Sequence, residues 1–322
     1  MDVRQFTHGQ ELDQVLLVRE RVGRDGGRSW RLVLGDRTGS LEATVDGELA
    51  AGCAPGACVR VAGYVEPQGR LAVRSLRPAA THEYALADLL DGPRIAAERM
   101  EADLRELVAT VQCRHLRALL ERVFARGSDT WEAFRAAPAA KRYHQAYRHG
   151  LLEHSLTVAQ GVSALSSTFG GVDRDVAVTG ALLHDIGKLD AYTSDPLAID
   201  LTDLGRLQGE IALGYYRVRR LIEDLPGFPE ELSAAVLHII LSHHGQLEHG
   251  SPVVPATREA TLVHMIDNLG GRLGSFDRLE KELPAGAAWS AFDRALGGGA
   301  YFGGRDEDPG GDGAAARAAH AA

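Results

Sequence analysis

Cysteine is scarce in this chain, and the few cysteines present exclude two classes of protein. Cys53, Cys58 and Cys113 are the three among 322 residues. An odd number without a regular framework argues against a disulfide-stapled domain, and the spacing of the first two is unlike that of paired zinc ligands. We therefore expect all three thiols to be reduced and structural.

Long apolar runs are also missing. No stretch approaches the roughly 20 apolar residues that span a bilayer, and residues 1–14 lack a basic region followed by an apolar run. We therefore expect no membrane association, no secretory signal and a cytoplasmic location. The hydrophobic fraction of 45% and the charged fraction of 25% are typical of a globular protein whose length suggests two domains.

Positive charge and aromatic side chains are limited as well. The formal net charge is -9 and aromatic residues make up 6% of the chain. Phosphate binding depends on the local density of lysine and arginine, so the net charge argues against general affinity for nucleic acid over the whole surface but leaves local binding open. Residues 113–148 are the most basic stretch, although a solvated helix face is the favoured interpretation of that run.

Short runs of alternating apolar and polar residues fill residues 15–77, separated by turns rich in glycine and aspartate. This pattern predicts strands rather than helices. Five short strands favour a small OB-fold-like barrel over residues 1–80, with any other five-stranded barrel or meander as the alternative. The predicted strands are Val15–Val22, Trp30–Leu34, Leu41–Val45, Ala57–Val65 and Leu71–Leu76.

A four-residue motif within these turns bears on nucleic-acid binding. Asp36-Arg37-Thr38-Gly39 resembles the Asp-x-Thr-Gly turn of OB-fold modules that bind single-stranded nucleic acid. Trp30 and Tyr64 are candidates for base stacking and Arg37 for a phosphate contact. Packing in the protein core is the commoner use of both aromatic residues.

From Leu86 onward the apolar positions recur at helical spacing, which predicts an all-α second region. We expect a helical connector over residues 81–140 and a helical domain over 141–296. Residues 297–322 are rich in Gly, Ala and Asp and are expected to be a disordered tail. The helices predicted in the second domain are 150–165, 176–189, 209–225, 229–241 and 258–276.

Histidine and aspartate residues at wide separations on these helices point to a metal centre. His154, the adjacent pair His184 and Asp185, and Asp267 each follow apolar helical residues. An unpaired carboxylate in such a setting is costly to bury, and imidazole with carboxylate suits Mn, Fe, Co, Ni or Zn. Lys188, three residues after Asp185, is expected to offset charge on a bound phosphate.

The order of these residues resembles that of HD-domain metallohydrolases, which are helical proteins that hydrolyse phosphate esters with a divalent metal. The segments Gly150–Leu156, Leu182–Lys188, Leu241–Gly245 and His264–Leu269 are similar to those of YhaM-type 3′→5′ exoribonucleases, which join an OB-fold to an HD domain. The resemblance implies metal-dependent release of nucleoside 5′-monophosphates from single-stranded RNA, with single-stranded DNA as an alternative substrate. Asp185 and Lys188 are the expected catalytic residues, and Mn is the expected metal, with Co, Fe or Mg as alternatives.

One position departs from the family. Glu210 stands where the family has a histidine expected to serve a second metal. Glu210, His243 and His244 are the candidates for a second site, so the centre holds one or two ions. His238 is either a further ligand or a core histidine, and His264 is interpreted as a histidine that hydrogen-bonds near the site.

Two other functions fit the same residues. One is an HD phosphohydrolase that acts on nucleotides or cyclic dinucleotides, with the barrel as an accessory. The other is a noncatalytic RNA-binding protein that retains a vestigial HD site, an alternative that Glu210 favours. Substrate length and metal content distinguish these functions from an exoribonuclease.

Overall fold

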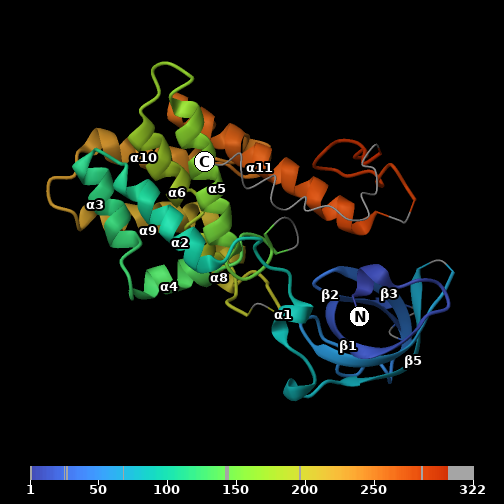
Figure 1. Ribbon diagram of the computed structural model, residues 1–322. Helices are drawn as coiled ribbons and strands as arrows, with labels where there is room; N and C mark the ends of the chain where they lie inside the picture. The colour runs from blue at the N-terminus through green and yellow to red at the C-terminus, as the bar shows by residue number, and fades with distance from the viewer. Residues whose placement is uncertain are drawn as a thin grey trace.

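The computed structural model describes residues 2–24, 26, 28–67, 69–141, 145–195, 197–283 and 286–303. The chain forms a β barrel followed by a larger group of helices (Figure 1). Most of the tail predicted from residue 297 lies outside the described residues. Its first part, up to Gly303, folds back on the chain, since Tyr301 forms a bridge with Trp289 and Ala300 is buried.

The five strands close into a barrel in the order β1-β2-β3-β5-β4, with β4 pairing back to β1. All neighbouring strands are antiparallel except β3 and β5, which are parallel. The barrel predicted from the sequence is therefore confirmed. The strands are β1 (Glu11–Arg24), β2 (Ser29–Asp36), β3 (Gly39–Asp46), β4 (Cys58–Val65) and β5 (Arg70–Pro78).

Alternation of side chains along each strand fills the barrel. Leu32 and Leu34 of β2 are fully buried, as are Val59 and Val61 of β4, because every second residue points inward. Gly63 lies at an irregularity in the β4–β5 pairing, where a Cβ atom would meet the carbonyl oxygen of Ala72 at 2.1 Å. This close approach of two backbones requires glycine.

The Asp-x-Thr-Gly motif forms the turn between β2 and β3. One carboxylate oxygen of the buried Asp36 accepts hydrogen bonds from the Thr38 backbone N–H (2.7 Å) and hydroxyl (2.6 Å), and from the Gly39 N–H (3.2 Å). The other oxygen accepts the Val3 N–H at 2.8 Å and so fixes the short 3-10 helix η1 (Val3–Gln5) against the turn. Asp36 and Thr38 therefore hold the backbone together, while Arg37 remains exposed.

The remaining chain is helical. Its helices are α1 (Leu86–Leu89), α2 (Ala97–Ala109), α3 (Arg114–Val123), α4 (Asp129–Ala136), α5 (Gly150–Ser166), α6 (Arg174–Leu183), α7 (Lys188–Ala191), α8 (Asp203–Gln208), α9 (Glu210–Glu223), α10 (Glu230–Ser242) and α11 (Arg258–Glu282), with 3-10 helices η3 (Thr81–Glu83) and η4 (Leu247–His249). Within the described residues, no helix is long and apolar enough to cross a bilayer.

Helix α6 is the centre of the helical region. Every residue of α6 from Val176 to Leu183 is buried, as expected for a helix that is covered on all sides. Helices α5, α10 and α11 pack around it, and α3 also contacts it. Because α6 is enclosed, the residues that follow its C-terminal end lie inside the protein.

Two sequence predictions about the helices need correction. Residues 81–140 are more than a connector, because α2 to α4 share one hydrophobic core with the later helices. The helix predicted over residues 176–189 is interrupted, since α6 ends at Leu183 and α7 begins at Lys188. At Gly187 a Cβ atom would meet the carbonyl oxygen of Glu210 at 1.9 Å, so the turn packs directly on the start of α9.

Two ion pairs connect the C-terminal half of α11 to the segment that follows α1. Lys281 of α11 contacts Asp91 at 2.5 Å, and Asp277 contacts Arg94 at 3.1 Å. The C-terminal half of α11 extends from the other helices toward the barrel (Figure 1). A cleft between the two parts of the chain is lined by η1, the β2–β3 turn, the segment around α1, the loop before α5 and the end of α11.

Candidate metal centre

Two histidines of the site occupy equivalent positions at the ends of helices. His184 is the C-cap of α6 and His243 the C-cap of α10. Each Nδ1 atom lies near the carbonyl oxygen three residues earlier, at 2.7 Å from Ala181 and 2.8 Å from Ile240. Carbonyls in the last turn of a helix lack partners within the helix, so each accepts an Nδ1–H and directs the opposite nitrogen, Nε2, inward.

His154, in the second turn of α5, is oriented by a side chain instead. Its Nδ1 atom lies 3.1 Å from Oε1 of Gln145, and the imidazole is buried. Gln145 has a left-handed backbone with φ of 59°, an uncommon conformation for a residue other than glycine. Gln145 thus accepts the Nδ1–H and directs Nε2 of His154 toward the other residues of the cluster.

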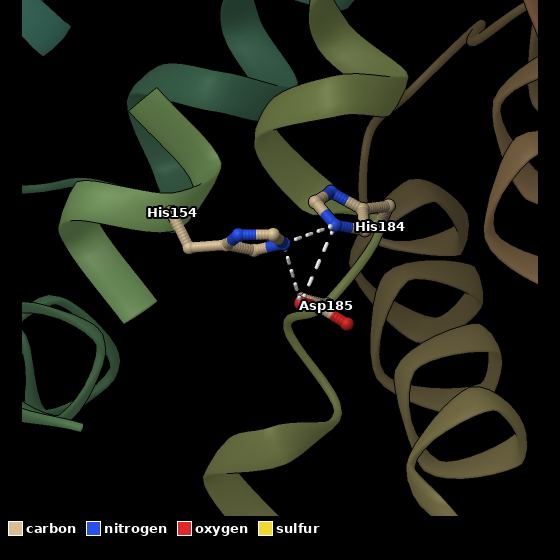
Figure 2. Close-up of side chains that lie close together, drawn as sticks. All are labelled: His154, His184 and Asp185. Atoms are coloured by element: carbon tan, nitrogen blue, oxygen red, sulfur yellow. Dashed lines mark hydrogen bonds and ion pairs between the residues drawn. The ribbon is translucent and has the colours of Figure 1, made fainter. Parts of the chain in front are cut away.

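The side chains of His154, His184 and Asp185 point toward one another (Figure 2). The Nε2 atom of His154 lies 3.2 Å from Nε2 of His184, 3.2 Å from Oδ2 of Asp185 and 3.1 Å from Oδ1 of Asp267. His184 Nε2 lies 3.3 Å from Asp185 and 3.8 Å from Asp267. The structure therefore brings together the four ligands predicted from the sequence.

The chemistry of these donors fits a divalent metal ion. Ligand atoms about 2.0–2.2 Å from one ion lie roughly 3–3.5 Å apart, close to the separations found here. With both Nδ1–H groups donated to oxygen atoms, the Nε2 lone pairs of His154 and His184 face each other. Two lone pairs at 3.2 Å repel, so this position suits a positive charge, either a metal ion or a proton.

The charges within the cluster compensate one another. Burial disfavours a proton on His154, but hydrogen bonds to Asp185 and Asp267 outweigh burial and raise the pKa of His154 to about 9. Burial opposes ionisation of Asp185, yet Lys188 and His184 hold its pKa well below the usual range. The pKa of Asp267 is also lowered against burial, chiefly by His154. Both carboxylates are therefore ionised and available as ligands.

Lys188 lies beside this cluster, as the sequence predicted. Its Nζ atom is 2.6 Å from Oδ2 of Asp185, and its side chain is mostly buried. Burial lowers the pKa of Lys188, but the attraction of Asp185 is stronger and raises it overall. Lys188 contacts Asp185 even though α6 and α7 are separate helices, because Lys188 is the first residue of α7 and follows the turn directly.

The candidates for a second ion lie next to the first cluster. Nε2 of His243 is buried, has no hydrogen-bond partner among the described residues and lies 3.5 Å from Oδ1 of Asp185. Nε2 of the neighbouring His244 lies 3.5 Å from Oε1 of Glu210. The two carboxylate oxygens of Asp185 thus face different groups, Oδ2 toward His154 and His184 and Oδ1 toward His243.

His264 and His238, whose roles the sequence left open, form hydrogen bonds outside the cluster. Nδ1 of His264 lies 2.8 Å from the carbonyl oxygen of His243, in line with its interpretation as a hydrogen-bonded neighbour of the site. Nε2 of His238 accepts the backbone N–H of Ala256 at 2.9 Å. Burial lowers the pKa of His238, which suits a neutral ring that accepts this bond.

The three candidates for nucleic-acid binding lie apart from one another. Trp30 packs against the barrel core with the Arg21 guanidinium 3.9 Å from its ring centroid. Tyr64 lies on the outer face of β4, beside Arg74. Arg37 lines the cleft between the barrel and the helices. No shared stacking platform is formed by the two aromatic residues.

Sequence reasoning found the charged groups of the site but missed Gln145. A glutamine carries no charge and forms no spacing pattern with the ligands, so nothing in the sequence distinguishes it. The closest signal is its place nine residues before His154, within the segment leading into α5.

Comparison with known proteins agrees with this geometry. Residues 151–271 match the family model of the HD domain. The chain is 29% identical over 289 residues to the 3'-5' exoribonuclease YhaM of Geobacillus sp. (strain WCH70), covering 86% of this chain and 87% of that protein. It is 29% identical over 287 residues to the protein of that name from Bacillus subtilis (strain 168), covering 86% and 90%. The similarity to YhaM-type exoribonucleases predicted from the sequence motifs is confirmed, and the helical region contains an HD domain.

Proposed function

We propose that this chain is a metal-dependent 3′→5′ exoribonuclease that releases nucleoside 5′-monophosphates from single-stranded RNA. The observation that carries the proposal is the convergence of His154, His184, Asp185 and Asp267 in a buried cluster within an HD domain. The similarity to exoribonucleases extends over 86% of the chain, so it includes the barrel as well as the catalytic region.

His154, His184, Asp185 and Asp267 would hold a divalent metal, which would supply Lewis-acid chemistry for hydrolysis of the phosphodiester. Imidazole and carboxylate ligands together suit Mn, with Co, Fe or Mg as alternatives. Glu210, His243 and His244 are proposed to hold a second ion, and they lie next to Asp185. The unpartnered Nε2 of His243 supports this second site, because a buried nitrogen of this kind is costly without a ligand.

The two carboxylates differ in accessibility, which suggests different roles. The side chain of Asp267 is 18% exposed, whereas that of Asp185 is 2% exposed. Asp267 is therefore the carboxylate better placed to orient an attacking water molecule and to accept its proton. Lys188 offsets negative charge on the phosphoryl group, a role for which its position beside Asp185 is suited.

Product analysis tests this proposal. Single-stranded RNA labelled at its 5′ end, incubated with the protein and Mn, should yield a ladder that shortens from the 3′ end and accumulates 5′-monophosphates. A single large internal cut, or hydrolysis of mononucleotides and cyclic dinucleotides in preference to RNA, would contradict the proposal. Binding of RNA without hydrolysis, at full metal occupancy, would instead support a noncatalytic RNA-binding protein.

A further inference from the structure

A cleft of about 760 Å³ lies between the barrel and the helices, outside the metal centre. Its lining comes from η1, the β2–β3 turn, the segment around α1, the loop before α5 and the end of α11. Four basic side chains face it, from Arg4, Arg37, Arg148 and Lys281, against two carboxylates. One of these carboxylates, Asp91, is already paired with Lys281.

The three arginines of the cleft differ from the ion-paired arginines of the barrel surface. Arg31 is paired with Glu42 at 2.6 Å and Arg74 with Glu11 at 2.5 Å. The guanidinium groups of Arg4, Arg37 and Arg148 are exposed and form no ion pair or side-chain hydrogen bond within the described parts of the chain. In a chain with net charge -9, three unpaired cations facing one cleft attract an anion.

The backbone that carries these arginines is firmly held. The Thr38 hydroxyl accepts the Arg4 N–H at 3.2 Å, which keeps Arg4 next to the Asp36 turn that carries Arg37. After Arg148, the His149 N–H donates to Ala136 at 3.2 Å and its ring contacts the Arg135 carbonyl oxygen at 2.5 Å. The two parts of the chain thus present their cations from fixed positions, so little ordering is needed on binding.

The position of the cleft relates it to the metal centre. Arg148 lies two residues before the first residue of α5, and His154 lies in the second turn of that helix, so one segment of the chain carries both a cleft residue and a proposed metal ligand. No phenylalanine, tyrosine or tryptophan lines the cleft among the described residues. Stacking of bases is therefore absent from this surface, and charge is the feature that a ligand can recognise.

We infer that this cleft binds the sugar–phosphate backbone of single-stranded RNA, with Arg4, Arg37 and Arg148 contacting phosphates of the segment that precedes the 3′ end. The inference rests on the proposed exoribonuclease function and assigns the path of its substrate. Because the contacts are to phosphates, RNA binding is independent of sequence and decreases with salt.

Charge reversal with matched controls tests the inference. Binding of 5′-fluorescein-labelled single-stranded RNA is measured by anisotropy in chelator, where no hydrolysis is expected, for wild type, Arg37→Glu and Arg148→Glu. Each variant should bind at least about tenfold more weakly, as expected for loss of a hydrogen bond between charged groups. The slope of log affinity against log salt should fall by about 0.7 for each lost phosphate contact.

Two control variants have the same change of charge elsewhere. Arg70 is exposed on the barrel and does not line the cleft. Arg114 is exposed on α3 and bonds only to His115 among the described residues. Arg70→Glu and Arg114→Glu should bind RNA within about twofold of wild type, apart from the common effect of net charge. Equal losses in cleft and control variants would overturn the inference, as would unchanged binding in Arg37→Glu and Arg148→Glu.

Hydrolysis separates this inference from the proposed function. With Mn, the cleft variants should lose activity on long RNA through KM, and the ratio of activity on long RNA to that on a small phosphodiester should fall about tenfold. If wild-type protein binds RNA through these arginines without degrading it, the proposed exoribonuclease activity is refuted and the proposed RNA binding in the cleft is supported. If wild-type protein degrades RNA and both cleft variants behave like the control variants, RNA binding in the cleft is refuted and the proposed exoribonuclease activity is supported.

Discussion

Replacing Gln145 should weaken metal binding although Gln145 itself is not a ligand. Its Oε1 atom accepts the Nδ1–H of His154 at 3.1 Å, which directs Nε2 toward Asp185 and Asp267. In Gln145→Ala the buried Nδ1 loses this acceptor, so the ring is free to adopt other orientations and the other tautomer. Loss of such a partner typically lowers metal affinity 10–100-fold, or about 1.4–2.7 kcal/mol.

Calorimetric titration with Mn, on protein first stripped with chelator, measures this effect. Gln145→Glu keeps an acceptor at the same length and should retain affinity close to wild type. Gln112→Ala is the control, because Gln112 is exposed and its amide donates only to the Thr110 carbonyl within the described structure. A Gln145→Ala protein that binds Mn as tightly as wild type would refute the role of this hydrogen bond in orienting His154.

Four further predictions follow from the site and the fold. Asp185→Asn should abolish both RNA hydrolysis and metal binding. Asp185→Ala should have the same effects and should also lower the free energy of unfolding, because Lys188 loses its buried partner. Turnover near the wild-type rate in either variant would argue against Asp185 as a metal ligand. Glu210→Ala should reduce bound Mn from about two ions to about one and lower kcat more than affinity, while Glu210→His should preserve turnover. Unchanged stoichiometry and rate in Glu210→Ala would leave a single-ion site. A protein of residues 86–322 alone should cleave a small phosphodiester but act poorly on long RNA. Full activity of this protein on long RNA would show that the barrel does not contribute to substrate binding. Leu182→Ala, at a fully buried position of α6, should lower the free energy of unfolding by about 2–5 kcal/mol in urea titrations, and a loss below about 1 kcal/mol would contradict the central place of α6.

The barrel and the main residues of the candidate metal centre could be predicted because their signals are local. Alternation in β2, where Leu32 and Leu34 face inward, is a property of neighbouring residues and reports the strand directly. The His184-Asp185 pair stands at the end of an apolar helix, so its burial follows from the helix that carries it. Both predictions depend on short segments and on residue types with few alternative uses.

Other features depend on contacts between distant segments, which a single sequence does not reveal. The helix expected through Leu189 breaks after Leu183 because Gly187 packs on the backbone of α9, more than twenty residues later. Likewise, Arg4 and Arg148 come together only through the arrangement of the barrel against the helices.

The most direct test of the central claim measures bound Mn and RNA degradation in the same sample. Metal-stripped wild-type protein is titrated with Mn, and after each addition the bound metal and the rate of 3′-end shortening of single-stranded RNA are recorded. The metal centre formed by His154, His184, Asp185 and Asp267 predicts no shortening without Mn and a rate that rises with occupancy. Stripped protein that shortens RNA at the full rate would contradict it.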